Sequence, residues 1–125
     1  MANNKWREFD GPHYRLRDLG RPAIFLIPLK KLRQKHDGVL IEDRLHRFLI
    51  ANFGAFTTSS IPSFGVWKEP DQKAVVDESR QYKVSFAGKK HIPLLIEELA
   101  QIAALTEEDC IYLETGQYAC LVYPT

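Results

Sequence analysis

The stretch from Asp37 to Trp67 constrains the fold most, because its pattern is that of one helix, a glycine stop and a strand. At about 100° per residue, its apolar side chains fall on one side of a helix, as in amphipathic helices. They are Ile41, Leu45, Phe48, Leu49 and Phe53. We expect Asp37 to cap this helix and Gly54 to end it. A strand is predicted from Ala55 to Ser60, where aromatic and β-branched residues follow the glycine.

The rest of the chain predicts further strands and a second helix. The strands are 22–29, 66–68, 73–77, the alternating stretch 80–86, and 110–114 with 117–123, joined by a two-residue turn at Thr115-Gly116. The second helix is 91–104, and residues 30–36 form a basic loop. This order predicts an α+β fold with two helices on one face of a mainly antiparallel sheet, resembling the ferredoxin-like fold. Residues 1–21 are expected to form an irregular N-terminal arm, and 22–125 a single domain.

A family resemblance rests on the helix followed by FGAFT and later by GVW. This pattern resembles small bacterial α+β proteins of unknown function, a kind of small domain common in mobile gene cassettes. Those proteins tend to have two glycines where this chain has Gly54-Ala55. The resemblance covers part of the chain and implies a fold without a function.

Composition favours an ordinary globular domain, with 125 residues, 45% hydrophobic and 26% charged. The longest apolar run, Ala23 to Leu29, is too short for a membrane helix, and the first residues lack the apolar core of a secretory signal. We therefore expect a cytoplasmic protein without a membrane partner. Cys110 and Cys120 are expected to point to opposite faces of the last hairpin, and therefore to remain reduced thiols.

Charge is divided unevenly along the chain. Residues 1–37 carry nine Lys and Arg against four Asp and Glu, whereas residues 38–125 carry eight against twelve. A weak nucleic-acid or polyanion contact is one interpretation, and a solvated basic segment is the favoured alternative. The contact residues would be Lys30, Lys31, Arg33 and Lys35, with Arg15, Arg17 and Arg21 from the arm.

The sequence contains no catalytic signature, so it leaves open whether the protein is an enzyme. Glu42 and His46 stand four apart on the first helix, near His36 and Asp37, a spacing that a metal site would use. A helix cap and an ordinary surface pair explain these residues better. The isolated glycines do not form a phosphate-binding loop. We therefore predict no catalytic residue, no metal and no cofactor.

One cluster combines hydroxyl groups with an indole and is the candidate ligand site. Hydroxyls beside an aromatic ring can line a cleft for a small molecule. The residues are Thr57, Thr58, Ser60 and Trp67. The favoured alternative is a solvent-facing strand edge, with Trp67 filling the core beneath it.

Self-association is predicted because several strands are apolar on both faces, although two helices can cover only one face of the sheet. The expected homodimer interface is formed by Tyr112, Ala119, Leu121 and Tyr123. In the alternative, the arm folds across the open face of its own subunit. The leading hypothesis is thus a homodimeric binding or interaction protein. The alternatives are a small-molecule-binding protein or enzyme with a cleft between helices and sheet, and a weak nucleic-acid binder.

Overall fold

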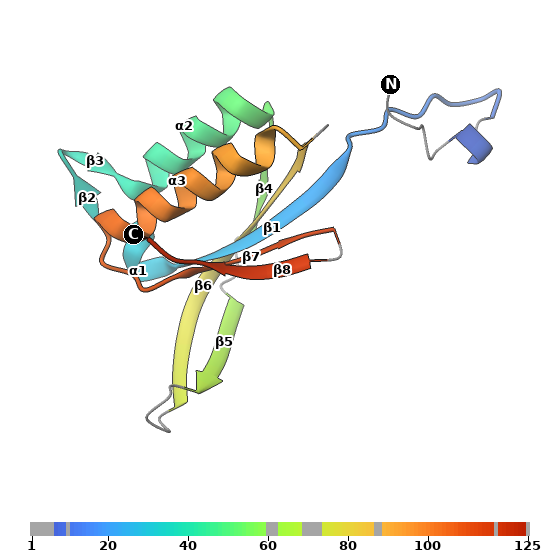
Figure 1. Cartoon of the computed structure of the whole chain (residues 1–125). Helices are drawn as coiled ribbons and strands as arrows, with labels where there is room; N and C mark the ends of the chain where they lie inside the picture. Colours follow the sequence, from blue (N-terminus) through green and yellow to red (C-terminus); the bar gives the residue numbers. More distant parts are fainter. Residues whose placement is uncertain are drawn as a thin grey trace.

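A computed structural model describes residues 7–9, 11–59, 63–68, 74–86, 89–116 and 118–124 (Figure 1). The helical elements are η1 (Arg7–Phe9), α1 (Leu29–Leu32), α2 (Ile41–Phe53) and α3 (His91–Leu105). The strands are β1 (Arg21–Pro28), β2 (Lys35–His36), β3 (Val39–Leu40), β4 (Thr57–Thr58), β5 (Ser63–Lys68), β6 (Ala74–Phe86), β7 (Ile111–Thr115) and β8 (Tyr118–Val122).

The described strands of the main sheet follow the order β4-β6-β1-β7-β8, with β5 paired to the other end of β6. Every pairing in this sheet is antiparallel. The connection through α2 passes over β6, and the connection through α3 passes over β1. These two interleaved crossovers give the ferredoxin-like strand arrangement. The predicted α+β fold class is therefore confirmed.

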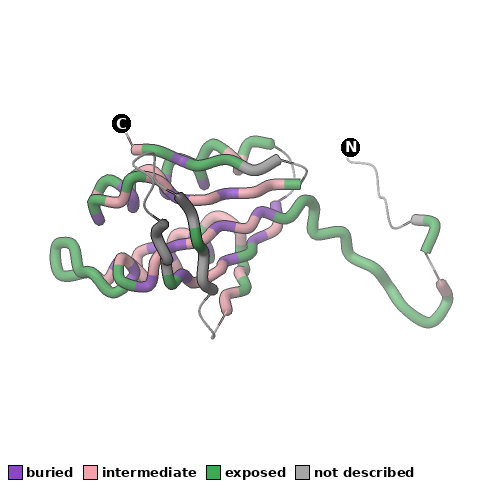
Figure 2. Tube along the Cα trace, turned by 90° about the horizontal axis from the view of Figure 1, so that it is seen from below, coloured by how far each residue is buried: buried purple, intermediate pink, exposed green. Residues whose placement is uncertain are grey.

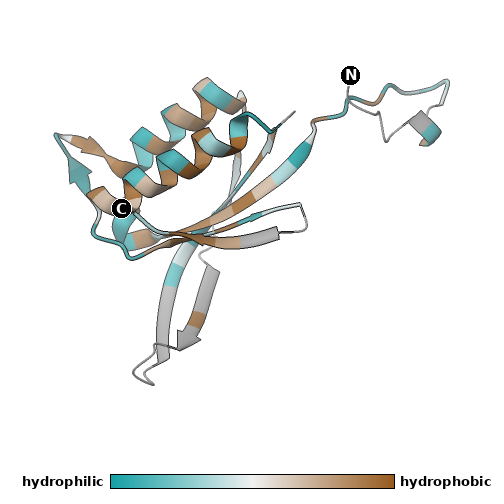
Figure 3. Ribbon diagram, viewed as in Figure 1, coloured by the Kyte–Doolittle hydropathy of each residue, from teal (hydrophilic) through white to brown (hydrophobic). Residues whose placement is uncertain are grey.

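Helices α2 and α3 cover one face of the sheet (Figures 1 and 3). On β1, Ala23, Phe25 and Ile27 are fully buried, whereas Ile24 and Leu26 on the other face are half-buried. The same alternation buries Tyr82, Val84 and Phe86 of β6 and Ile111 and Leu113 of β7. The core is thus the layer between these alternate strand residues and the inner faces of the two helices.

The predicted apolar side of α2 is confirmed. Ile41, Leu45 and Leu49 are buried, and Phe48 and Phe53 pack against the core. Gly54 ends the helix with φ 78°, and its N–H donates to the Ile50 carbonyl at 3.0 Å. This left-handed conformation strains any residue that carries a Cβ.

The start of α2 differs from the prediction. Asp37 is not the cap, because the helix begins at Ile41 after Leu40, without a side-chain cap hydrogen bond. Asp37 and Gly38 instead have φ values of 52° and 78° and join β2 to β3. Two positive φ values in a two-residue loop are the signature of a tight hairpin turn, for which Asp-Gly is a preferred sequence. The predicted basic loop therefore contains the one-turn helix α1 and the first strand of this hairpin.

Two strand predictions also need correction. The stretches predicted as 73–77 and 80–86 are one continuous strand, β6. In the last hairpin the predicted turn at Thr115-Gly116 would pair Leu113 with Tyr118. In the structure Thr115 is the last residue of β7 and pairs with Tyr118, and Leu113 pairs with Cys120, a register shifted by two residues. A shift of two residues preserves the side-chain faces. Cys110 and Cys120 are accordingly thiols, as predicted. Among the described residues, no helix is long and apolar enough to span a bilayer.

Candidate functional site: a depression beside the β2–β3 hairpin

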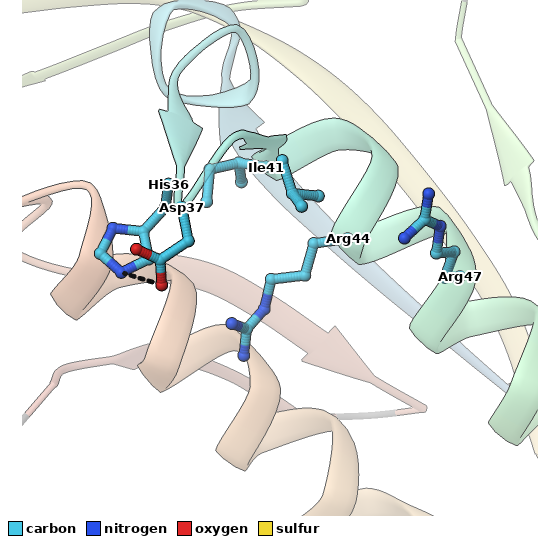
Figure 4. A pocket seen from close by; sticks show the side chains of 6 residues that line it. His36, Asp37, Ile41, Arg44 and Arg47 are labelled. Carbon is cyan, nitrogen blue, oxygen red and sulfur yellow. Dashed lines mark ion pairs between the residues drawn. The ribbon is translucent and has the colours of Figure 1, made fainter.

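A depression of about 400 Å³ lies where the β2–β3 hairpin meets α2 (Figure 4). Its volume falls within the range of small-molecule sites. It is lined by His36, Asp37, Val39, Ile41, Arg44 and Arg47. We refer to it as the hairpin depression.

The local sequence explains why these side chains meet. The tight turn places His36 and Asp37 at the tip of the hairpin, and β3 runs into α2 without a linker. The N–H of Ile41 donates to the carbonyl of Gln34 at 2.9 Å, which ties the start of the helix back to the segment before β2. The hairpin is thus fixed beside the first two turns of α2.

The two arginines of the depression differ in their interactions with the rest of the chain. The Arg44 guanidinium donates from Nε and Nη2 to the two carboxylate oxygens of Glu98 on α3, at 3.0 and 3.1 Å. This hydrogen bond raises the pKa of Arg44. Figure 4 shows Arg44 reaching toward α3 while the Arg47 guanidinium points in another direction. Arg44 is therefore a structural group, and Arg47 is an exposed cation.

At the hairpin tip, His36 and Asp37 form a loose pair with 3.7 Å between Nε2 and Oδ2. Their side chains are 49% and 92% exposed, so both remain accessible to a ligand. A carboxylate can accept hydrogen bonds from ribose hydroxyls or face a cation, and an imidazole can stack on a flat ring. Val39 adds an exposed apolar side chain to this lining, so the depression is suited to bind a small polar ligand.

A second polar group lies further along α2, which we call the α2–β6 cluster: Glu42, His46, Thr58, Arg80 and Tyr82. Arg80 donates to Glu42 at 3.1 Å, and the His46 Nε2 lies 2.9 Å from the Tyr82 hydroxyl. The hydroxyl of Thr58 donates to the Gln81 carbonyl at 3.1 Å. Each of these partners lies within the cluster or on β6, the strand that carries Arg80 and Tyr82. Such internal bonding favours a structural role for the cluster.

Burial perturbs both central groups of the cluster. It raises the pKa of the fully buried Tyr82 phenol, with Arg80 opposing the rise. It also lowers the pKa of His46, although the Glu42 carboxylate opposes that shift. Perturbed groups are common at functional sites, but structural networks produce them too.

The His46 shift predicts a pH-dependent stability. An unfolded histidine has a pKa of about 6.5 and here takes up a proton more readily than the folded one. The free energy of unfolding should therefore be constant above that pH and fall as the pH drops toward the lowered folded value. Urea melts from pH 8 to 5 should show this fall, and His46→Gln should reduce it. His13, which is exposed in the N-terminal arm, supplies the control. If His13→Gln reduces the pH dependence as much as His46→Gln does, the assignment to His46 is wrong.

The structure does not bring the predicted ligand residues into one site. Thr57 pairs with Lys83 and Thr58 with Tyr82, so their side chains point to opposite faces of the sheet. Trp67 pairs with Val75, seven residues along β6 from Tyr82, or roughly 23 Å of strand. Ser60 lies outside the described residues, as does the side chain of Trp67. Of the two members whose side chains are described, Thr58 is placed in a polar cluster.

The predicted polyanion residues lie along α1 and β2: Lys30 and Lys31 are on α1, Arg33 is its C-cap, and Lys35 is on β2. Lys31 donates to the Thr106 carbonyl at 2.7 Å and lies 3.9 Å from the Glu108 carboxylate. Lys30, Arg33 and Lys35 are exposed. Of the predicted interface residues, the half-buried Tyr112 pairs with Leu121, and both lie on the sheet face away from the helices. Tyr123 directly follows β8 and is exposed, and the side chain of Ala119 is outside the described part.

The sequence analysis did not predict that four residues line this depression: Val39, Ile41, Arg44 and Arg47. The available signal was the Asp-Gly pair, which predicts a hairpin just before the helix. The suggested metal spacing is explained otherwise, since Glu42 bonds to Arg80 and His46 to Tyr82. Within the described ranges, no group of three or more His, Cys, Asp or Glu residues could hold a metal ion.

The fold and this site define a small ferredoxin-like α+β protein. No family model and no curated protein matches the chain. Among solved structures, it is similar to a phage SAM lyase in complex with S-methyl-5'-thioadenosine, with a TM-score of 0.56 and 14% identity over 90% of this chain and 96% of that one. It is also similar to a phage SAM lyase in the apo state, with a TM-score of 0.52 and 11% identity over 88% and 96%. At these identities the likeness shows a shared fold.

Proposed function

We propose that this chain is a small-molecule-binding protein whose ligand is an S-adenosyl compound, either S-methyl-5'-thioadenosine or S-adenosylmethionine. The observation that carries the proposal is the fold likeness, over nearly the whole of both chains, to a lyase with S-methyl-5'-thioadenosine bound. A shared fold does not by itself transfer a ligand. The proposal therefore also needs a site of suitable size and chemistry.

The hairpin depression is the binding site in this proposal. The apolar Val39 side chain suits the adenine or thioether part, and the His36 ring can stack on the base. The Asp37 carboxylate suits the ribose hydroxyls or the positive sulfonium of S-adenosylmethionine. Arg47 suits the carboxylate of its methionine part. Arg44 holds the wall in place through Glu98.

Isothermal titration of the full chain with each compound tests the proposal, with ADP as a control for general nucleotide binding. We expect saturable binding of at least one S-adenosyl compound and weaker binding of ADP. Asp37→Asn should weaken it by about tenfold, the loss of one charged hydrogen bond. The variant should fold, because asparagine tolerates the positive φ of this turn. Chromatography of a mixture with S-adenosylmethionine shows whether S-methyl-5'-thioadenosine is released, which would make the protein an enzyme.

Matched controls separate the site from general charge effects. Asp43→Asn removes an exposed carboxylate of α2 that does not line the depression, and Arg33→Gln is the corresponding control for Arg47→Gln. Both controls should leave the affinity unchanged. If neither S-adenosyl compound binds at millimolar concentration, or if the controls lose as much affinity as the site variants, the proposal is wrong.

Weak polyanion binding stays a separate prediction. Its contacts would be Lys30, Arg33 and Lys35, because Lys31 already donates to the Thr106 carbonyl and lies beside the Glu108 carboxylate. A steep decrease of RNA or DNA affinity with rising salt would support it. The predicted homodimer is also a proposal, and the surface that favours it is described next.

A further inference from the structure

We infer that the sheet face away from the helices is covered by a second copy of this chain, related by a two-fold axis that runs along β1. The surface in question, which we call the open sheet face, has an apolar centre. It consists of Ile24, Leu26, Tyr112 and Leu121, which the strand register places on this face, and of the exposed Tyr123, which directly follows β8. This inference does not depend on the proposed ligand.

The open sheet face is more apolar than a solvated surface requires. Leu121 is 52% and Tyr123 62% exposed. Leu121 lies beside the half-buried Tyr112, which in turn lies beside the half-buried Leu26. In an antiparallel sheet with one wet face, these alternate positions are usually polar. A contiguous exposed apolar patch usually marks an interaction surface.

The described part of the N-terminal arm, residues 7–9 and 11–20, does not supply the cover. Residues 12–20 are exposed, and the segment runs away from the sheet instead of across it (Figures 1 and 2). A local turn directs this exit: the N–H of Gly20 donates to the Asp18 carboxylate at 2.9 Å, and Gly20 has φ 86°. These described residues thus leave the open sheet face uncovered.

The charges beside the apolar centre point to a second copy as the occupant. Ile24 on the central strand β1 pairs with Lys83 on one side and Glu114 on the other. A positive and a negative side chain therefore flank one isoleucine in a single row across the face. A two-fold axis along β1 exchanges the two sides of this row. Lys83 of one copy then faces Glu114 of the partner subunit, and the two Ile24 side chains meet at the axis.

The next row fits the same operation. Leu26 lies on the axis, with Gln81 on one side and Tyr112 on the other. The symmetry places Gln81 opposite Tyr112 of the partner subunit. Because the Tyr112 hydroxyl donates to Glu114 of its own chain at 2.7 Å, it can accept a hydrogen bond from the Gln81 amide. The open sheet face is thus complementary to itself in charge and in hydrogen bonding.

A projecting hairpin extends the same surface. β5 and the N-terminal half of β6 leave the sheet on the side opposite the helices (Figure 1). On β5, Val66 is 68% exposed. A partner seated on the open sheet face would lie beside this hairpin and find a further apolar contact there.

Sedimentation equilibrium of the full chain at micromolar concentration tests the inference. The expected mass is twice the 14.4 kDa of one chain. Leu121→Glu should give the monomer mass, because it places a charge within the apolar centre. The matched control is Leu94→Glu, which is 43% exposed on the solvent side of α3 and should leave the assembly intact. Circular dichroism checks that each variant is folded.

A charge exchange tests the axis itself. Lys83→Glu and Glu114→Lys should each weaken the assembly by placing like charges opposite one another, and the double variant should restore it. A wild-type mass of 14.4 kDa throughout would overturn the inference. It would also be overturned if Leu94→Glu dissociated the assembly as readily as Leu121→Glu, or if the double charge exchange failed to restore association.

Discussion

Leu45→Ala and Leu99→Ala are each expected to lower the free energy of unfolding by about 2–5 kcal/mol. Both side chains are fully buried, Leu45 on α2 and Leu99 on α3, and both belong to the one hydrophobic core. Truncation removes three carbon atoms from each and leaves a cavity that the surrounding side chains fill only partly. A loss of this size is a large fraction of the stability of a domain of this length.

Denaturant melts measure this loss, and each helix offers a matched control. Ile50→Ala on α2 and Leu94→Ala on α3 alter side chains that are 54% and 43% exposed, so their effects should stay within about 0.5 kcal/mol. If Leu45→Ala or Leu99→Ala stayed within about 1 kcal/mol of the parent, the assignment of the inner helix faces would be incorrect.

Glu98→Ala is expected to cost about 1–3 kcal/mol, the second largest effect. Glu98 is 8% exposed, and it accepts two hydrogen bonds from Arg44. Its removal leaves the guanidinium without its carboxylate partner. Because the Arg44 side chain is itself 34% exposed, water compensates part of the loss, and the cost should stay below that of a fully buried pair.

The neighbouring Glu97 supplies the control for this prediction. It is exposed on the same helix, so Glu97→Ala should change the unfolding free energy by less than about 0.5 kcal/mol. The double variant Arg44→Met with Glu98→Leu should recover much of the stability lost in Glu98→Ala, because it removes both polar partners together. Equal effects of Glu97→Ala and Glu98→Ala would contradict the structural role of the pair.

Much of the fold could be predicted because the spacing of apolar residues along a helix or strand indicates which side chains are buried. The apolar side of α2 and the alternation of Tyr82, Val84 and Phe86 were both recognisable in the sequence. The bounds of the second helix were also close, but the polarity of its residues does not predict which of them are buried. Ile96 is 36% exposed, while Glu98 is buried. A carboxylate is buried where a distant arginine compensates it, and helical periodicity does not report that partner.

The hairpin before α2 was missed because Asp37 suits two local structures. An aspartate is a good helix cap and also a good first residue of a tight turn. The following Gly38 has a positive φ, which favours the turn over the helix cap. Because the depression requires this hairpin to lie against α2, its lining could not be predicted once Asp37 was assigned to a cap.

The predicted ligand cluster depended on proximity along the sequence. Thr58 and Trp67 are nine residues apart in sequence, which suggested one cluster. The structure pairs them with distant parts of the long strand β6. The length of β6 was itself underestimated, because 73–77 and 80–86 were predicted as two separate strands. Proximity in sequence is thus a poor guide where one strand extends well beyond its neighbours.

The central claim is that the hairpin depression binds an S-adenosyl compound. The most direct test is a titration of the ¹⁵N-labelled full chain with S-methyl-5'-thioadenosine, followed by amide chemical shifts. The account predicts saturable shifts that concentrate on residues 36–47, the hairpin and the first turns of α2, and that weaken in Asp37→Asn. Shifts confined to the α2–β6 cluster or the open sheet face, or no saturable shifts at millimolar ligand, would contradict it.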